Sequence, residues 1–348
     1  MATHPLQSVT YELADALDAN ELYQRNGWTD GLPIVPPTEE RVRACLEAAR
    51  LAPGDSVGVE SVRQRPILAE KVAINAVMAG CLPSYMPVVV ATLRAMCEAD
   101  FNLHGSTAST GGSAQFIVVN GPVRTAIDMN ATHGVFGNGN RANATIGRAI
   151  RLILINVLGC IPGQLDRSTL GHPGKFTFCI AEDEEDSPWT PLAQERGVPT
   201  YTSGVTVMAC EAPRQAMNEW THDPEEILET FAAEIRHNML TYSIWPGNYA
   251  LVLPKQLREL LGVAGWQKKD IREYIYRSAR VSRRDWTTVG KRKIVDRGGG
   301  PDQEFTALRS PDDLLVIAAG GPAGGFGAVI PPWLGPRSHA VTQTIDVP

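Results

Sequence analysis

The chain has 348 residues, of which 43% are hydrophobic and 20% are charged, and its formal net charge at pH 7 is −6. This composition can bury a sizeable core, so it excludes a chain that is disordered throughout. The negative balance excludes a broadly basic surface, and we expect no nucleic-acid partner. The length alone fits two domains or one large α/β domain.

The sequence favours a cytoplasmic protein without a membrane partner. The N-terminal residues lack the basic start and the apolar run of a signal peptide. The densest apolar stretches, residues 86–96 and 150–158, are too short to span a bilayer. None of the six cysteines lies in a Cys-x-x-Cys pair, which predicts reduced, mostly buried thiols.

The first hundred residues are predicted to be mainly helical. A helix is expected around residues 11–23, and Thr38 is expected to cap a second helix that ends near Arg50. Glycines, an Asp-Gly pair and prolines between these two helices predict irregular structure. A short strand is expected at 56–62. Two helices at 66–79 and 84–98 are apolar almost all round, which indicates burial.

The remaining chain alternates strands with helices. A polar loop at 103–113 precedes a strand at 116–119, and a Gly/Asn-rich loop precedes a helix at 142–158. Further strands are predicted at 205–209, 249–253 and 314–318, with helices at 224–240, 254–262 and 269–280. The strands are continuous apolar runs, as expected when both sheet faces are covered.

This alternation predicts an α/β fold with a largely parallel sheet flanked by helices. The mainly helical N-terminal region, residues 1–100, should pack onto the α/β body of residues 101–348 in one integrated globular unit. Residues 74–83 and 155–162 also resemble each other, and both end in Gly-Cys-aliphatic-Pro. Shared helix-stop chemistry explains this similarity, and a duplicated α/β unit is the alternative.

A loop that leads into the helix at 142–158 is the first candidate binding site. It contains Asn138, Gly139, Asn140 and Arg141. Unpaired backbone N–H groups at a helix start, together with the helix dipole, attract a carboxylate or a phosphate. A capped helix with a solvated basic face is the alternative. The loop is neither a phosphate-binding Walker loop nor a dinucleotide fingerprint, so any cofactor stays unknown.

A second glycine-rich loop follows the last strong strand. Its glycines Gly320, Gly321, Gly324 and Gly325 would let the backbone approach a ligand closely. Ligands of open α/β sheets bind just beyond the carboxyl ends of the strands, which predicts substrate contact here. A surface loop without a ligand is the alternative interpretation.

Three residues are candidates for catalysis. His104 lies among hydroxyl residues and could transfer a proton near neutral pH, and Asp30 is an alternative acid. Cys81 is a possible nucleophile, although a preceding helix C-terminus would raise its pKa. Helix-terminating packing is the alternative role for Cys81 and Cys160.

The sequence predicts no metal site, because its seven histidines form no close pair. Whether His104, His133 or His172 converges on a metal is left open by the sequence. Apolar residues outside the predicted core, such as Trp245, Trp286 and Trp333, favour a homo-oligomer, most simply a dimer. Burial of these tryptophans within one subunit is the alternative.

Several blocks of the sequence resemble one bacterial family. They include WTDGLPIVPPTEERV at 28–42, NAVMAGC at 75–81, VNGP at 119–122, RANATIGRAIRLILIN at 141–156, STLGHPGKF at 168–176 and the closing IPPW. The family is uncharacterised, is related to proteins that carry a UGSC motif (selenocysteine or cysteine, then Gly-Ser-Cys), and is often described as thioredoxin-like or thiol-disulfide isomerase-like. The resemblance implies dithiol chemistry, but this chain has no Cys-Gly-Ser-Cys and no Cys-x-x-Cys.

Together these features predict an enzyme that acts on a small anionic substrate, bearing a carboxylate or a phosphate. A hydrolase or a lyase is favoured, because no redox-cofactor motif is legible. Its site should lie in loops at one end of the sheet. The alternatives are a thiol redox protein that uses Cys81 or Cys160, and a non-catalytic ligand-binding or assembly subunit.

Overall fold

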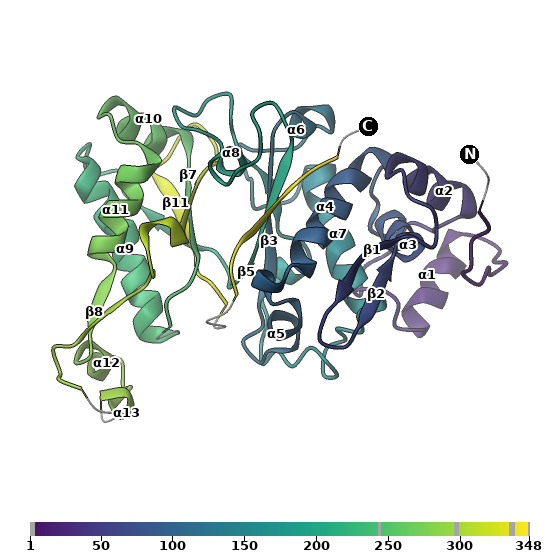
Figure 1. Ribbon diagram of the computed structural model, residues 1–348, viewed down its shortest axis with the longest axis horizontal. Helices are drawn as coiled ribbons and strands as arrows, with labels where there is room; N and C mark the ends of the chain where they lie inside the picture. Colours follow the sequence, from purple (N-terminus) through teal and green to yellow (C-terminus); the bar gives the residue numbers. More distant parts are fainter. Residues whose placement is uncertain (1–3, 243–244, 296–298, 334–337, 347–348) are drawn as a thin grey trace.

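Two four-stranded sheets pack face to face in the middle of the molecule, and helices cover the outer face of each sheet (Figure 1). The computed structural model describes residues 4–242, 245–295, 299–333 and 338–346. The mixed α/β class is as expected. Among the described helices, none has both the length and the apolar character that crossing a membrane requires.

The first sheet has the strand order β12-β5-β3-β4. Helices α4 and α7 cover its outer face, on the right in Figure 1, and α3 packs against these two helices. The elements of this half that follow residue 113 are β3 (Ala114–Asn120), α6 (Val123–Ala126), α7 (Arg141–Asn156), β4 (Cys179–Ala181), α8 (Leu192–Glu195), β5 (Gly204–Cys210) and β12 (Val341–Thr344).

The second sheet has the order β10-β7-β11-β6, and helices α9, α10 and α11 cover it on the left. Its elements are β6 (Arg214–Met217), α9 (Pro224–Thr241), β7 (Tyr249–Leu253), α10 (Lys255–Val263), α11 (Lys268–Ser278), β10 (Leu314–Ala318) and β11 (Phe326–Ile330). A small excursion at the lower left holds β8 (Arg280–Ser282), α12 (Asp285–Thr288), α13 (Arg292–Val295) and β9 (Glu304–Thr306).

The N-terminal region packs against the first half. Its elements are α1 (Ala16–Arg25), α2 (Glu39–Ala48), β1 (Ser56–Glu60), β2 (Arg65–Leu68), α3 (Ala69–Ala79), α4 (Met86–Cys97) and α5 (Leu103–Ala108). Helix α5 replaces the first six residues of the loop predicted at 103–113. The Asn102 side chain caps it by accepting from the Gly105 N–H, and the Thr107 hydroxyl donates to the Leu103 carbonyl.

Burial on both faces explains the continuous apolar strands. In β3, Ile117 and Val119 face the outer helices, whereas Phe116 and Val118 face the second sheet. The strands of the second sheet alternate in the same way, so side chains from both inner faces form one core layer between the sheets. The four predicted strands at 116–119, 205–209, 249–253 and 314–318 are all confirmed.

The predicted strand directions were wrong. Each sheet has one parallel pair, β3–β4 or β7–β10, and its other two pairs are antiparallel. A largely parallel sheet would require a helical crossover between all neighbouring strands. Here β5 and β11 each run antiparallel to both of their neighbours, which needs no such crossover.

The two sheets repeat one strand arrangement. Strands β3, β4 and β5 of the first sheet correspond in order and direction to β7, β10 and β11 of the second. The fourth strands are exchanged: β6 continues from β5 but pairs with β11, whereas β12 continues from β11 but pairs with β5. Each half therefore completes the sheet of the other.

The crossing point of the exchanged strands lies between Cys210 and Pro332, which form an isolated antiparallel bridge. The Glu211 N–H donates to the Pro331 carbonyl at 2.9 Å, and the Trp333 N–H donates to the Ala209 carbonyl at 3.0 Å. These two bonds are equivalent under the repeat, so a pseudo-two-fold axis passes through the crossing.

The similar segments at 74–83 and 155–162 have a different explanation. They are the ends of α3 and α7, which pack together, and the Asn156 side-chain amide donates to the Asn75 side-chain oxygen at 2.7 Å. Gly80 caps α3 in the left-handed conformation, with φ of 95°. The similarity is therefore shared helix-end chemistry within the first half, as the helix-stop interpretation expected.

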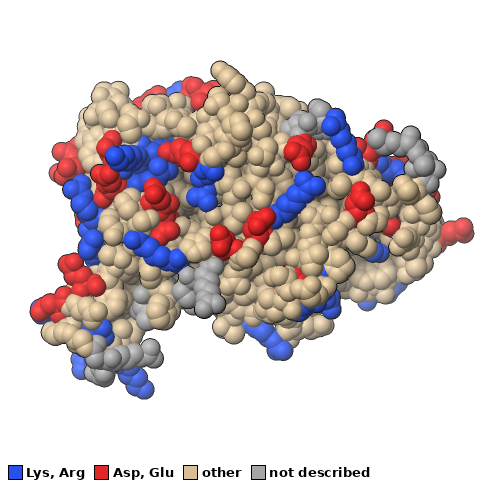
Figure 2. Space-filling model, viewed as in Figure 1, with Lys and Arg blue, Asp and Glu red and all other residues tan. Residues whose placement is uncertain are grey.

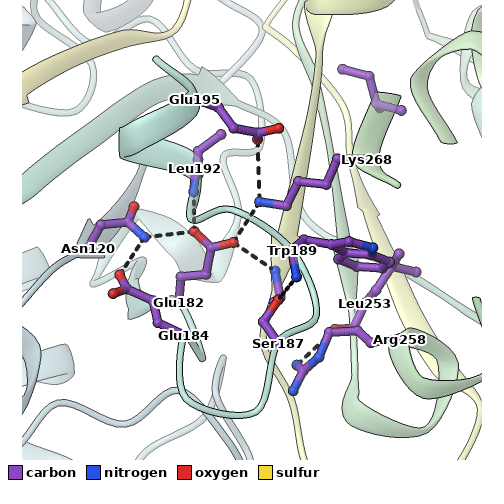
Figure 3. A network of polar contacts seen from close by, with 12 residues as sticks. Asn120, Glu182, Glu184, Ser187, Trp189, Leu192, Glu195, Leu253, Arg258 and Lys268 are labelled. Atoms are coloured by element: carbon purple, nitrogen blue, oxygen red, sulfur yellow. Dashed lines mark hydrogen bonds and ion pairs between the residues drawn. The ribbon is translucent and has the colours of Figure 1, made fainter. Parts of the chain in front are cut away.

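A buried polar network links the two halves beyond the carboxyl end of β4 (Figure 3). The Glu182 carboxylate accepts from the Lys268 ammonium at 2.9 Å, from the Asn120 amide at 2.7 Å and from the Leu192 N–H at 2.6 Å. The side chains of Glu182 and Lys268 are only 1% and 2% exposed. Because the Glu182–Lys268 ion pair is buried, the network holds α11 of the second half against the first sheet.

Replacing Lys268 by Met should lower the free energy of unfolding by about 3–5 kcal/mol, because it leaves the buried Glu182 carboxylate without its cation. Adding Glu182→Gln should recover part of this loss, since the charge is removed while an oxygen remains for Asn120 and Leu192. Urea denaturation monitored by circular dichroism measures each value.

Lys255→Met is the matched control, because its ion pair with Asp186 is solvent-exposed and its loss should change stability much less than the loss of a buried pair. If Lys268→Met were no more destabilising than Lys255→Met, the network would not join the halves in the way described.

Candidate functional site

The strand crossing gathers a group of polar side chains from distant parts of the sequence. We call this group the crossover site, and it consists of Asp166, Ser168, Lys175, Glu211 and Tyr242. The first three lie in the segment that precedes β4, Glu211 directly follows β5, and Tyr242 ends α9. All but Asp166 are partly exposed, so solvent reaches the group.

Asp166 anchors one side of the crossover site. Its carboxylate accepts from Arg151 at 2.9 Å and from Lys175 at 2.8 Å, and it also accepts from the Ser168 hydroxyl. Burial alone would raise the pKa of Asp166, but the hydrogen bonds from Lys175 and Ser168 outweigh burial and lower the pKa to about 2. Asp166 is therefore a permanent anion that orients its neighbours.

Lys175 places an ammonium group next to Asp166. Its Nζ lies 2.8 Å from the Asp166 carboxylate and 2.6 Å from Ser168 Oγ. Burial lowers the pKa of Lys175, and the hydrogen bond to Asp166 opposes that effect. Two of the three ammonium protons therefore point to Asp166 and Ser168. The positive charge of Lys175 also lowers the pKa of Glu211, against the effect of burial.

Glu211 and Tyr242 form the other side of the site, where the phenol hydrogen-bonds to the carboxylate. Burial raises the pKa of Glu211 and outweighs the lowering influences of Tyr242, Arg214 and Lys175. Burial also raises the pKa of Tyr242, and the Glu211 charge adds to the effect. A carboxyl group with a raised pKa beside a phenol that keeps its proton is suited to proton transfer.

Two glycines form the wall that both sides share. A Cβ atom on Gly111 would lie 3.0 Å from the Tyr242 hydroxyl oxygen, whereas one on Gly112 would lie 3.3 Å from Ser168 Cβ and 2.9 Å from the Gly171 Cα. Adjacent residues therefore touch both sides of the crossover site. Both glycines belong to the polar segment that the sequence singled out at 103–113.

His104, predicted for catalysis, lies elsewhere. It is on α5, with its Nδ1 3.7 Å from the Glu60 carboxylate. Asp30 forms a two-bond ion pair with Arg148 of α7 at 2.8 Å for each bond, which fixes the irregular segment before α2. Burial of the Cys81 thiol raises its pKa to about 12, and the thiol donates to the Thr145 carbonyl. The structure does not bring these three residues together.

The predicted anion site at the start of α7 forms structural contacts. The Asn140 side chain caps the helix by accepting from the Asn143 N–H at 3.0 Å. The Arg141 guanidinium donates twice to the Gly80 carbonyl, at 3.0 and 2.9 Å, and so caps α3. Asn138 and Gly139 are exposed. Substrate binding by these four residues stays a prediction.

The second glycine-rich loop meets the start of the Gly/Asn-rich loop that precedes α7. Gly320, Gly321 and Gly324 line a cavity of about 560 Å³ that residues 134–137 line from the opposite side. Gly325 lies beside this cavity, and its N–H donates to Glu219. We call this space the glycine cavity. It lies at the carboxyl ends of β7 and β10, as the sequence interpretation anticipated for the second loop.

The remaining candidate groups do not assemble into a metal or thiol centre. Within the described ranges, no group of three or more His, Cys, Asp or Glu side chains could hold a metal ion. All six cysteines are free thiols, and burial raises the pKa of Cys45 and Cys97 to about 11.

Of the tryptophans that suggested an oligomer, Trp286 is buried within the chain, whereas Trp245 is exposed. Figure 2 shows basic and acidic side chains interspersed on one face, without a continuous basic area.

No protein-family model matches this chain, and no curated protein matches it. The site is therefore interpreted from its own geometry.

Sequence reasoning missed all five residues of the crossover site as functional candidates. Glu211 had one usable signal, because an acidic residue that directly follows a buried strand is placed at a sheet end. Lys175 lies in a His-Pro-Gly-Lys turn that the sequence singled out without a role. Nothing in the sequence around Tyr242 marks it, since its position depends on how α9 packs.

The low pKa of Asp166 predicts a specific loss of stability in acid. The folded pKa, about 2, lies below the unfolded value of about 3.9, so the stabilisation is complete above pH 4 and is lost as the pH falls towards 2. Asp166→Asn should be less stable than the parent by about 2 kcal/mol at pH 6, and this difference should nearly vanish by pH 2. Chemical denaturation at several pH values tests this, and a difference independent of pH would contradict it.

Proposed function

We propose that this protein is an enzyme that transfers a proton to or from a small anionic substrate at the crossover site, in a reaction of the lyase type. The observation that carries the proposal is that Glu211, a carboxyl group of raised pKa, feels the charge of the Lys175 ammonium, while their partners Tyr242 and Ser168 lie against the adjacent glycines Gly111 and Gly112.

Glu211 is the proposed general base and acid. A catalytic acid or base works best when its pKa lies near the working pH, and burial moves Glu211 in that direction. In an elimination, its carboxylate takes a proton from a carbon next to the substrate anion, and the electron pair forms a double bond. The leaving group departs from the neighbouring carbon and takes the proton from Glu211, which restores the carboxylate.

Tyr242 and Asp166 are the proposed positioning residues. The raised pKa of Tyr242 keeps its proton in the hydrogen bond that orients the Glu211 carboxylate. Asp166 holds Lys175 and stays charged, so the ammonium remains directed into the site. The third ammonium proton would bind the carboxylate or phosphate of the substrate, and a hydrogen bond between two charged groups is worth about 1.5–3 kcal/mol.

A lyase fits this geometry better than a hydrolase that uses Ser168. The Ser168 hydroxyl donates to Asp166, whose pKa of about 2 makes it a very weak base. The 2.6 Å contact between Lys175 and Ser168 favours a serine hydrolase as the second candidate, but Lys175 would have to lose its proton while paired with Asp166. A thiol mechanism is disfavoured because burial raises the pKa of Cys81 and Cys160.

Proton NMR in D2O tests the proposal with a panel of small hydroxycarboxylates and their phosphate esters, including malate, citrate and phosphoglycerate. We expect at least one compound to exchange a carbon-bound proton or to eliminate. Glu211→Gln should lower kcat/KM at least about 100-fold, as for loss of a general base. Lys175→Met should mainly raise KM.

Two further variants separate catalysis from folding. Tyr242→Phe removes a hydrogen bond that lowers the pKa of Glu211, so the acidic limb of the pH profile should move to higher pH. Glu225→Gln, an exposed acid in the first turn of the same helix α9, should leave the rate unchanged. Turnover by Glu211→Gln at the parent rate would refute the assignment.

A further inference from the structure

The glycine cavity occupies the place in the second half that the Glu182 network fills in the first. The Glu182 N–H donates to the Val119 carbonyl at 3.1 Å, and the Ala319 N–H donates to the Leu253 carbonyl at the same distance. Both bonds extend the equivalent parallel pairs β3–β4 and β7–β10. Ala319 is therefore the counterpart of Glu182, and Pro254 is the counterpart of Asn120.

The two halves differ at these positions in side-chain volume and charge. In the first half, Asp183 and Glu184 follow Glu182, whereas Gly320 and Gly321 follow Ala319 in the second. Gly320 has φ of 118°, and its added Cβ would lie 3.0 Å from Pro254, so a larger residue would be strained there. Three acidic side chains in the first half therefore correspond to one methyl group and two hydrogens in the second. The open cavity of about 560 Å³ lies at the corresponding sheet end, within the usual size range of ligand pockets.

Three backbone N–H groups of the glycine loop are already hydrogen-bonded within the protein and are not available to an anion. The Gly320 N–H donates to the Ala131 carbonyl, the Gly324 N–H donates to Gln256, and the Gly325 N–H donates to Glu219. Among the described residues that line the cavity, none carries a charged side chain. An anion would therefore lose its hydration without gaining a cation or these donors.

The walls instead suit an uncharged aromatic ring. Phe136 and Phe326 line the cavity and are 38% and 51% exposed, which is unusual for phenylalanine. Val252 and Ala328 add apolar surface, and Gln215 and Thr132 are the side chains that can form hydrogen bonds. Exposed aromatic side chains around a concave apolar surface are typical of a binding site.

We propose that the glycine cavity is a second ligand site, which binds a small uncharged molecule or substituent with an aromatic ring. It shares no lining residue with the crossover site, and it binds an uncharged ligand, whereas the crossover site binds an anion. The small residues Ala319, Gly320 and Gly321 leave the space, and Phe136 and Phe326 supply the contact surface.

Fluorescence titration with 2-naphthol, which is uncharged at pH 7, tests the site, and 2-naphthoate is the anionic comparator with the same ring. We expect 2-naphthol to bind with a dissociation constant on the order of 1 mM or lower. 2-Naphthoate should bind at least about tenfold more weakly, because it gains no partner for its charge.

Two variants locate the binding. Phe326→Ser removes an aromatic wall, and Ala323→Phe fills the cavity from an exposed position, so both should fold and should weaken 2-naphthol binding about tenfold or more. Phe176→Ser is the matched control, because Phe176 is 50% exposed and does not line the cavity; it should leave binding within twofold. Absence of 2-naphthol binding, equal affinity for 2-naphthoate, or unchanged binding by both cavity variants would overturn the proposal.

Discussion

The exchange of the last strand between the two halves is the constraint on which the rest of this structure depends. The backbone bonds from Glu211 to Pro331 and from Trp333 to Ala209 fix the crossing, and neither sheet is complete without a strand from the other half. Because β5 leaves its own sheet at this point, Glu211 is carried next to the end of α9. The loops before β3 and β4 reach the same place, since both strands start at the end of the sheet where β5 finishes.

The buried charges of the molecule serve two different purposes. Glu182 is enclosed with a lysine, an amide and a backbone donor, so its carboxylate is balanced and joins the halves. Glu211 is half-buried and has a phenol as its hydrogen-bond partner, whereas the nearby cation is committed to Asp166. Burial therefore dominates the pKa of Glu211 and raises it. This contrast separates a structural carboxylate from one suited to chemistry.

The repeat also explains how one fold holds two unlike sheet ends. At the carboxyl end of β4 the chain supplies acidic side chains and closes the space with ion pairs. At the equivalent end of β10 it supplies alanine and glycine, and a cavity remains. The same backbone arrangement therefore carries a buried network of ion pairs at one sheet end and an open cavity at the other.

The sequence predicted the elements better than their arrangement. Apolar runs such as 249–253 marked the buried strands, because a strand that is buried on both faces consists almost entirely of hydrophobic residues. Strand direction was missed, since that pattern is the same for parallel and antiparallel neighbours. The glycine loop at 320–325 was placed correctly at a sheet end. Glu211 and Tyr242 could not be paired, because 30 intervening residues and the packing of α9 determine their contact.

Burial at the strand crossing raises the pKa of Glu211, and a direct titration of that carboxyl group tests this most sharply. Protein labelled with 13C at the glutamate side-chain carboxyl carbon can be titrated by NMR, and Glu211→Gln identifies the Glu211 signal. The structure predicts a midpoint clearly above the ordinary glutamate value of about 4.3. A midpoint at or below that value would show that the crossing does not bury the carboxyl group as described.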